Sequence, residues 1–242
     1  NEIKKLSINK NYKFIDLTNP RCLFLPNFVR VNKDNGKISN FCNLDYQRKV
    51  EKYVNNSSTE SIFIFGGRFP MYLSGKKFDN QEGGIEPGKV WIEEFQSTRY
   101  QESFQSVFKE QILRIANMGK EVILIYPIPE TGFDTKSVIY NRIPKIMVNL
   151  NKKEFEKQLQ ISPITTSYEV FKSRTESSFK LLDSIKHKNI TRVYPHKFFC
   201  NNTIKNRCIT HNQKEIFYFD HNHLSNSGTK YIINLIFESI KN

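Results

Sequence analysis

The sequence predicts an α/β fold in which a parallel sheet lies between layers of helices. Two observations support this prediction. Short runs of β-branched and aromatic residues end in turn residues, as strands do, and most of these runs are separated by segments with the apolar spacing of amphipathic helices. Alternation of strand and helix along a chain is typical of a parallel sheet covered by helices.

Five segments are predicted to be strands because β-branched or aromatic residues stand together and turn residues follow. They are residues 12–17, 61–65, 121–126, 190–194 and 215–219. Four segments place apolar residues three or four positions apart and are predicted to be helices. They are residues 44–54, 104–118, 167–185 and 231–240.

A single domain is predicted to span residues 1–242, because the chain has no internal repeat and no linker rich in Pro, Gly or Ser. Its 38% hydrophobic and 25% charged residues are typical of a globular protein. No apolar run approaches the ~18–20 residues that cross a bilayer. Residues 1–20 also lack the features of a secretory signal.

The chain is strongly basic, with 37 Lys and Arg residues against 24 Asp and Glu residues and a net charge of +13. Such a charge favours nucleic acid, an anionic membrane surface or acidic glycans as partners. The basic residues are scattered and do not alternate with stacking aromatics, so nucleic acid is not expected. A compositional bias of the source genome is the alternative explanation of the charge.

The four cysteines form two local pairs, Cys22 with Cys42 and Cys200 with Cys208, and each pair encloses a polar, turn-rich segment. Two disulfides are the favoured interpretation, which indicates an oxidising compartment such as a bacterial periplasm. Free thiols in a cytosolic protein are the alternative. Neither pair has the spacing of a zinc site, and no metal site is expected.

The segment 215–228 contains the clearest candidate for chemistry. A predicted strand ends at Asp220, and a turn carries His223 towards a helix capped by Ser225 or Asn226. An Asp three residues before a His can accept a hydrogen bond from one imidazole nitrogen and leave the other as a general base. A capping Asp beside a surface His is the alternative for such a short pattern.

This segment, with Leu224, Ser225 and Gly228, resembles the last block of the SGNH (GDSL-type) hydrolases. Four further features resemble the SGNH domains that are fused to acyltransferase 3 membrane proteins. They are Cys22-Leu-Phe-Leu-Pro26, the following Cys42-Asn43, Phe65-Gly-Gly-Arg-Phe-Pro-Met-Tyr-Leu73 with Phe78-Asp-Asn80 and Glu82-Gly-Gly84, and Tyr126-Pro-Ile-Pro-Glu130. The resemblance implies a three-layer α/β sandwich of the SGNH-hydrolase, flavodoxin-like type.

The resemblance also implies roles for residues. His223 corresponds to the base and Asp220 to its orienting carboxylate. Gly66 or Gly67 corresponds to the glycine whose amide helps to hold the oxyanion, for which a plain turn is the alternative. Arg68 is expected to contact a carboxylate, a sugar or the oxyanion, unless it is solvated or ion-paired. Tyr72, Trp91 and Phe95 are candidates for a sugar-stacking surface, with a place in the core as the alternative.

Two family motifs are missing from the sequence. The third-block G-x-N-D has no counterpart, and the G-D-S block with the serine nucleophile does not occur. Residues 1–9 have the character of the tail of the helix that follows that block. The nucleophile is therefore expected upstream of residue 1 in a fragment that lacks the first strand, unless the protein lost the block. Ser74, Ser225 and Ser227 lack the setting of a nucleophile.

The function expected from this resemblance is that of the extracytoplasmic, periplasmic domain of an inner-membrane O-acyltransferase. An acyl group, most simply acetyl, would pass through a Ser-His-Asp mechanism to a cell-surface polysaccharide such as O-antigen of lipopolysaccharide, or to peptidoglycan. The expected partner is an acyltransferase 3 membrane domain in the same polypeptide that delivers the acyl donor, and no cofactor is expected. The alternatives are a free periplasmic carbohydrate esterase and a non-catalytic carbohydrate-binding or scaffold module.

Overall fold

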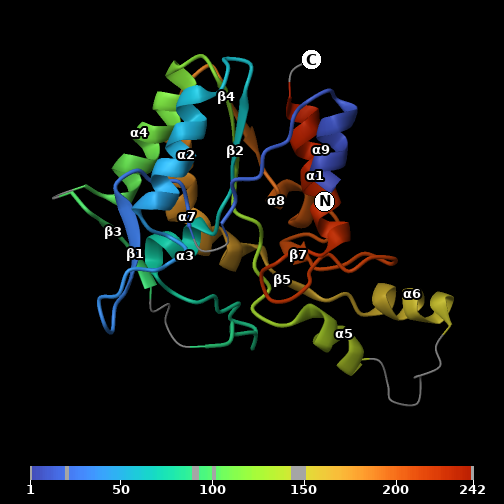
Figure 1. Cartoon of the computed structure of the whole chain (residues 1–242). Helices are drawn as coiled ribbons and strands as arrows, with labels where there is room; N and C mark the ends of the chain where they lie inside the picture. Colours follow the sequence, from blue (N-terminus) through green and yellow to red (C-terminus); the bar gives the residue numbers. More distant parts are fainter. Residues whose placement is uncertain (1, 20–21, 89–92, 100–101, 143–150, 241–242) are drawn as a thin grey trace. The chain divides into compact units, whose positions relative to one another are not determined.

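The computed structural model describes residues 2–19, 22–88, 93–99, 102–142 and 151–240 (Figure 1). They form two compact units. Unit 1 lies within Asn1–Lys76, Lys89–Tyr126 and Ser177–Val193, and unit 2 within Lys77–Gly88, Pro127–Glu176 and Tyr194–Asn242. A single domain over residues 1–242 stays a prediction.

Unit 1 contains a parallel sheet of three strands in the order β2 (Ile62–Phe65), β4 (Glu121–Ile125) and β6 (Ile190–Val193). Ile62 lies opposite Glu121, and Val122 lies opposite Ile190. The central strand β4 is an apolar run, and its middle residues are at most 1% exposed. A strand with neighbours on both sides and helices on both faces needs such a run. Three of the predicted strands are therefore confirmed.

Helices flank this sheet. α2 (Leu44–Asn56) and α4 (Phe104–Asn117) lie side by side in Figure 1, and Arg114 of α4 contacts Asn55 and Glu51 of α2. Each helix begins at a capping residue, because the side chains of Asn43 and Ser103 accept a hydrogen bond from a backbone N–H of the first turn. The third long helix, α7 (Tyr168–Asp183), runs from unit 2 into unit 1. The predicted α/β fold, a parallel sheet flanked by helices, is confirmed.

Unit 1 also contains elements that were not predicted. β1 (Phe28–Asn32) pairs antiparallel with β3 (Glu93–Ser97), and the short helix α3 (Phe69–Ser74) follows β2. The helix α1 (Glu2–Asn9) agrees with the helical character expected of residues 1–9. The predicted strand at residues 12–17 is wrong, because this segment is irregular and Ile15 is half exposed. β-propensity produces a strand only where a neighbouring strand and a buried face are available.

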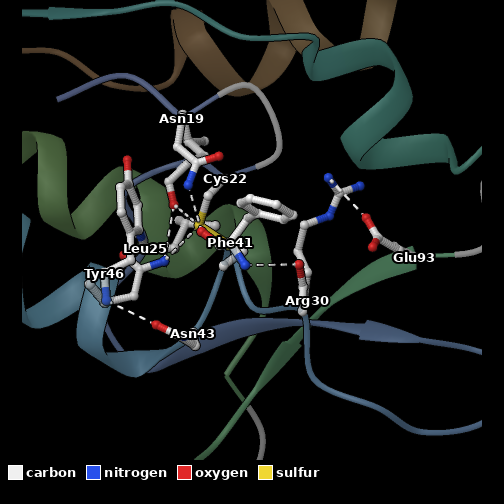
Figure 2. Close-up of a disulfide and its surroundings, with 12 residues drawn as sticks. Asn19, Cys22, Leu25, Arg30, Phe41, Asn43, Tyr46 and Glu93 are labelled. Atoms are coloured by element: carbon white, nitrogen blue, oxygen red, sulfur yellow. Dashed lines mark hydrogen bonds and ion pairs between the residues drawn. A yellow bond between two sulfur atoms is a disulfide. The ribbon is translucent and has the colours of Figure 1, made fainter. Parts of the chain in front are cut away.

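Both predicted disulfides are present. Figure 2 shows the bond between Cys22 and Cys42 and its surroundings. The Cys42 carbonyl accepts a hydrogen bond from the N–H of Arg30 (2.9 Å), and the Gln47 side chain of α2 donates to the Leu23 carbonyl (3.1 Å). The bond therefore fixes the loop before β1 to the start of α2.

Unit 2 consists mainly of helices and short strands. Its further elements are α5 (Thr135–Arg142), α6 (Lys152–Ile161), β5 (Thr165–Ser167), α8 (His196–Phe199), β7 (Arg207–Ile209) and α9 (Asn226–Ser239). β5 and β7 pair antiparallel, and the Cys200–Cys208 disulfide joins the loop after α8 to β7. Within the described residues, no helix combines the length and apolarity needed to cross a membrane.

The predicted strand at residues 215–219 is wrong. The segment forms two isolated bridges, Ile216 with His211 and Tyr218 with Leu224. The chain reverses shortly before and shortly after this segment, so each bridging residue finds one partner but no ladder develops. The last helix is confirmed but begins earlier than predicted, at Asn226, with Ser225 as its cap.

The disulfides give a stability prediction. Replacing Cys22 and Cys42 together by alanine should lower the free energy of unfolding by about 3 kcal/mol, because the bond closes a loop with a sequence separation of 20. The same change at Cys200 and Cys208, with a separation of 8, should cost about 2.5 kcal/mol. Denaturant unfolding measures both losses. If the variant without Cys22 and Cys42 were as stable as the parent, the Cys22–Cys42 bond would not stabilise the fold in this way.

Candidate active site

The candidate site is the turn formed by residues 220–223 in unit 2. One carboxylate oxygen of Asp220 accepts hydrogen bonds from the backbone N–H groups of Asn222 (2.9 Å) and His223 (2.8 Å). The other oxygen lies 2.8 Å from Nδ1 of the His223 ring. The structure therefore brings together the two residues predicted as base and orienting carboxylate, and one side chain fixes both the backbone and the ring of His223.

The protonation state of the pair follows from Asp220. Partial burial alone would raise the pKa of Asp220, but hydrogen bonds from the backbone of Asn222 and from the backbone and ring of His223 lower it overall. The ionised carboxylate can only accept a hydrogen bond, so Nδ1 carries the proton between the two side chains. In the neutral ring Nε2 is then unprotonated, as a general base requires.

The imidazole is open to solvent. The His223 side chain is 73% exposed, whereas that of Asp220 is 23% exposed. Nε2 is therefore accessible to an alcohol from outside this turn. The capping alternative is also present in the structure, because the carboxylate that holds the ring closes the turn through two backbone N–H groups.

Backbone hydrogen bonds hold the turn in a tight hairpin. The N–H of Phe219 donates to the His223 carbonyl (2.7 Å), and the N–H of Ser225 donates to the Phe217 carbonyl (2.8 Å). α9 begins directly against this hairpin, since a Cβ at Gly228 would collide with the Phe217 carbonyl. Glycine permits this close approach.

The segment before α5 supports the turn from another side. The N–H of Thr131 donates to the His221 carbonyl (2.9 Å), and the Thr131 hydroxyl lies 3.0 Å from the same oxygen. The Tyr218 hydroxyl donates to the Pro129 carbonyl (2.7 Å), and complete burial raises the pKa of Tyr218 far above its usual value, which keeps the donor protonated. The Pro129 carbonyl of the Pro-Ile-Pro-Glu motif and the following Thr131 therefore support the candidate turn.

A buried carboxylate that the sequence analysis missed also contacts the turn. Glu86 is 4% exposed and accepts hydrogen bonds from the Lys77 ammonium (3.3 Å), the Phe78 N–H (3.2 Å) and the Asn222 side-chain amide (3.3 Å). A buried carboxylate is costly unless such partners satisfy it. The loop that contains Glu86 has a polar composition, and no pattern in the sequence indicates that one of its Asp or Glu side chains is buried.

Asn80 connects this loop to the supporting segment. Its side-chain amide donates to the Thr131 carbonyl (2.8 Å), and its side-chain oxygen accepts from the N–H groups of Glu82 and Gly84 (2.8 Å each). Gly132 has a φ of +75°, and a Cβ there would collide with the Gly84 carbonyl. The Phe-Asp-Asn and Glu-Gly-Gly motifs therefore act together as a support for residues 131–132.

Gly66, Gly67 and Arg68 follow the carboxyl end of β2 in unit 1, and both glycines are exposed. The Arg68 carbonyl accepts hydrogen bonds from the N–H groups of Met71 and Tyr72 and so begins α3. The pair Asp220 and His223 belongs to unit 2. The roles of Gly66, Gly67 and Arg68 at an oxyanion or a substrate stay predictions.

The other candidates have structural contacts. Tyr72 packs edge-on against Phe95 (5.3 Å between ring centroids), and Phe95 packs against Phe104 (5.4 Å), so both belong to an aromatic cluster of unit 1. Trp91 lies outside the described residues. The Ser74 hydroxyl donates to the Pro70 carbonyl (2.7 Å). The described residues contain no group of three or more His, Cys, Asp and Glu side chains that could hold a metal ion.

A comparison with protein families finds one description that covers almost the whole chain. The family "SGNH domain (fused to AT3 domains)" matches residues 2–238. The chain belongs to the SGNH domain family. The predicted resemblance is therefore confirmed, and with it an association of this SGNH domain with acyltransferases.

The SGNH domain is also similar to a solved structure, the periplasmic domain of a lipopolysaccharide acetyltransferase from Salmonella ser. Paratyphi A. The two chains are 14% identical, the match covers 98% of this chain and 76% of the other, and the TM-score is 0.49. No curated protein matches the sequence.

The contact between α9 and the hairpin gives a prediction for the SGNH domain. Alanine in place of a helical glycine usually stabilises a protein by about 1 kcal/mol. Gly228→Ala should instead destabilise it by roughly 1–3 kcal/mol, because the added methyl group overlaps the Phe217 carbonyl. Denaturant unfolding, with Ser227→Ala as the control that changes little, measures the effect. A Gly228→Ala variant more stable than the parent would show that the Phe217 carbonyl does not lie close to residue 228.

Proposed function

We propose that this SGNH domain is the extracytoplasmic, periplasmic part of an O-acyltransferase that modifies a bacterial cell-surface polysaccharide, such as O-antigen of lipopolysaccharide. The observation that supports this proposal most strongly is the bond between Asp220 and Nδ1 of His223, which orients an exposed ring with its Nε2 accessible. Membership in a family fused to AT3 domains supports acyl transfer as the reaction.

In the proposed mechanism His223 acts twice as a base. Its Nε2 first takes the proton from a serine hydroxyl outside this sequence while the serine oxygen attacks the acyl carbonyl, and it returns this proton to the leaving group of the donor. Nε2 next takes a proton from a sugar hydroxyl, which attacks the acyl-enzyme. The released serine receives this proton. Ionised Asp220 stabilises the imidazolium in both steps.

The acyl donor would be delivered by an acyltransferase 3 membrane domain in the same polypeptide, with acetyl as the simplest acyl group. The mechanism then needs no cofactor in this domain. If water replaced the sugar hydroxyl, the same groups would hydrolyse an ester. Only the acceptor separates a transferase from an esterase, because both reactions share the acyl-enzyme.

The experiment is acyl transfer by the complete protein in cells, measured as acyl groups on the isolated polysaccharide. His223→Ala should abolish transfer because it removes the base, and Asp220→Asn should lower it by about 10²–10⁴-fold because the ring loses its orientation and its counter-charge. His187→Ala, a histidine outside the pair, is the matched control and should leave transfer unchanged. Normal transfer by the His223→Ala protein would refute the assignment.

A further inference from the structure

Phe219 is a large apolar side chain at the surface next to the candidate base. It is 59% exposed, although it immediately precedes Asp220 in a well-bonded hairpin. A single exposed apolar residue needs no explanation by itself. The place of Phe219 relative to His223 and to a lysine indicates a role.

Phe219 and His223 lie directly opposite each other across the turn. The bridge between Tyr218 and Leu224 is antiparallel, and the next pair inward is Phe219 with His223, whose N–H and carbonyl are bonded at 2.7 Å. Side chains of directly opposed residues project from the same face of a hairpin, with Cβ atoms about 5 Å apart. The side chains of Phe219 and His223 therefore leave the backbone on the same side of the turn.

A cation accompanies this ring. The ammonium of Lys136, on α5, lies 4.1 Å from the centroid of the Phe219 ring. No carboxylate among the described residues forms an ion pair with Lys136. Tyr140 lies one turn further along α5, on the same side as Lys136, and is 69% exposed. The Lys136 ammonium therefore covers one face of the exposed phenyl ring, and both groups lie near the turn that carries the base.

We infer that Phe219 and Lys136 form an acceptor subsite for an acidic pyranose, a sugar ring that carries a carboxylate. The inference rests on the proposed function and names the acceptor class for the same site. The C–H face of a pyranose stacks on the face of the Phe219 ring that the Lys136 ammonium does not cover, with its carboxylate at the edge of the ring. The carboxylate of the sugar pairs with the Lys136 ammonium. A ring bound in this way presents a neighbouring hydroxyl to Nε2 of His223.

A lipid surface fits these observations less well. Attachment to a bilayer requires a broad apolar face together with basic residues. Phe219 is one ring on a short turn, and it is bonded within a rigid hairpin. A single ring next to a general base fits one sugar residue better than a membrane.

The test measures binding by this chain without any reaction, so it does not depend on whether acyl transfer occurs. Titration with trigalacturonic acid, followed by NMR, should shift the Phe219 and His223 signals. Phe219→Ala should weaken binding at least tenfold and Phe219→Tyr should restore it. Phe41→Ala, which changes an equally exposed phenylalanine in unit 1 (59%), is the matched control and should bind as the parent does.

Lys136→Met tests the acidic part of the inference. It should weaken binding of trigalacturonic acid about tenfold and leave binding of neutral maltotriose unchanged. Equal binding by the parent and Phe219→Ala, or an equal loss in Phe41→Ala, overturns the subsite. Association with phosphatidylglycerol vesicles that depends on Phe219, without glycan binding, also overturns it in favour of a membrane contact. The proposed function fails by a different result, which is normal acyl transfer by the complete protein that carries His223→Ala.

Discussion

The carboxylate of Asp220 is the group on which the candidate site depends. It accepts three hydrogen bonds, two from backbone N–H groups that shape the turn and one from the imidazole of His223. Because the same group shapes the turn and orients the ring, the position of the base is determined within four residues of chain. Two further backbone hydrogen bonds hold this turn in place. The Phe217 carbonyl accepts from Ser225 at the start of α9, and the His221 carbonyl accepts from Thr131 in the segment before α5.

The support of the turn consists mainly of buried polar groups that satisfy one another. Glu86 and Asn80 lie in one loop, and Thr131 lies in the segment before α5. Glu86 bonds to the side chain of Asn222, and Asn80 bonds to Thr131, which in turn bonds to the carbonyl of His221. Buried polar groups with complete partners restrict a structure to one arrangement, whereas an unpaired group is costly. The motifs of polar and glycine-rich sequence in unit 2 therefore have a positioning role.

Sequence reasoning worked where the signal is local. The apolar run of β4, the periodic helices α2 and α4 and the spacing of the cysteine pairs depend on neighbouring residues, and Asp220 lies only three residues from His223. It failed where a partner is distant. β1 becomes a strand through β3, about sixty residues away, and residues 12–17 have strand-like composition but no such partner. Glu86 and Asn222 are 136 positions apart, and only the fold brings them together.

The central claim is that Asp220 holds the proton of the His223 ring on Nδ1. Long-range ¹⁵N–¹H NMR of the imidazoles measures this directly at a pH where they are neutral. We expect Nδ1 of His223 to be protonated and Nε2 to be bare, and we expect Asp220→Asn to change this pattern. His187 is an internal control, because its Nδ1 accepts a hydrogen bond from the Asn189 N–H (3.1 Å) and its proton belongs on Nε2. A His223 ring with its proton on Nε2 in the parent protein would contradict the account.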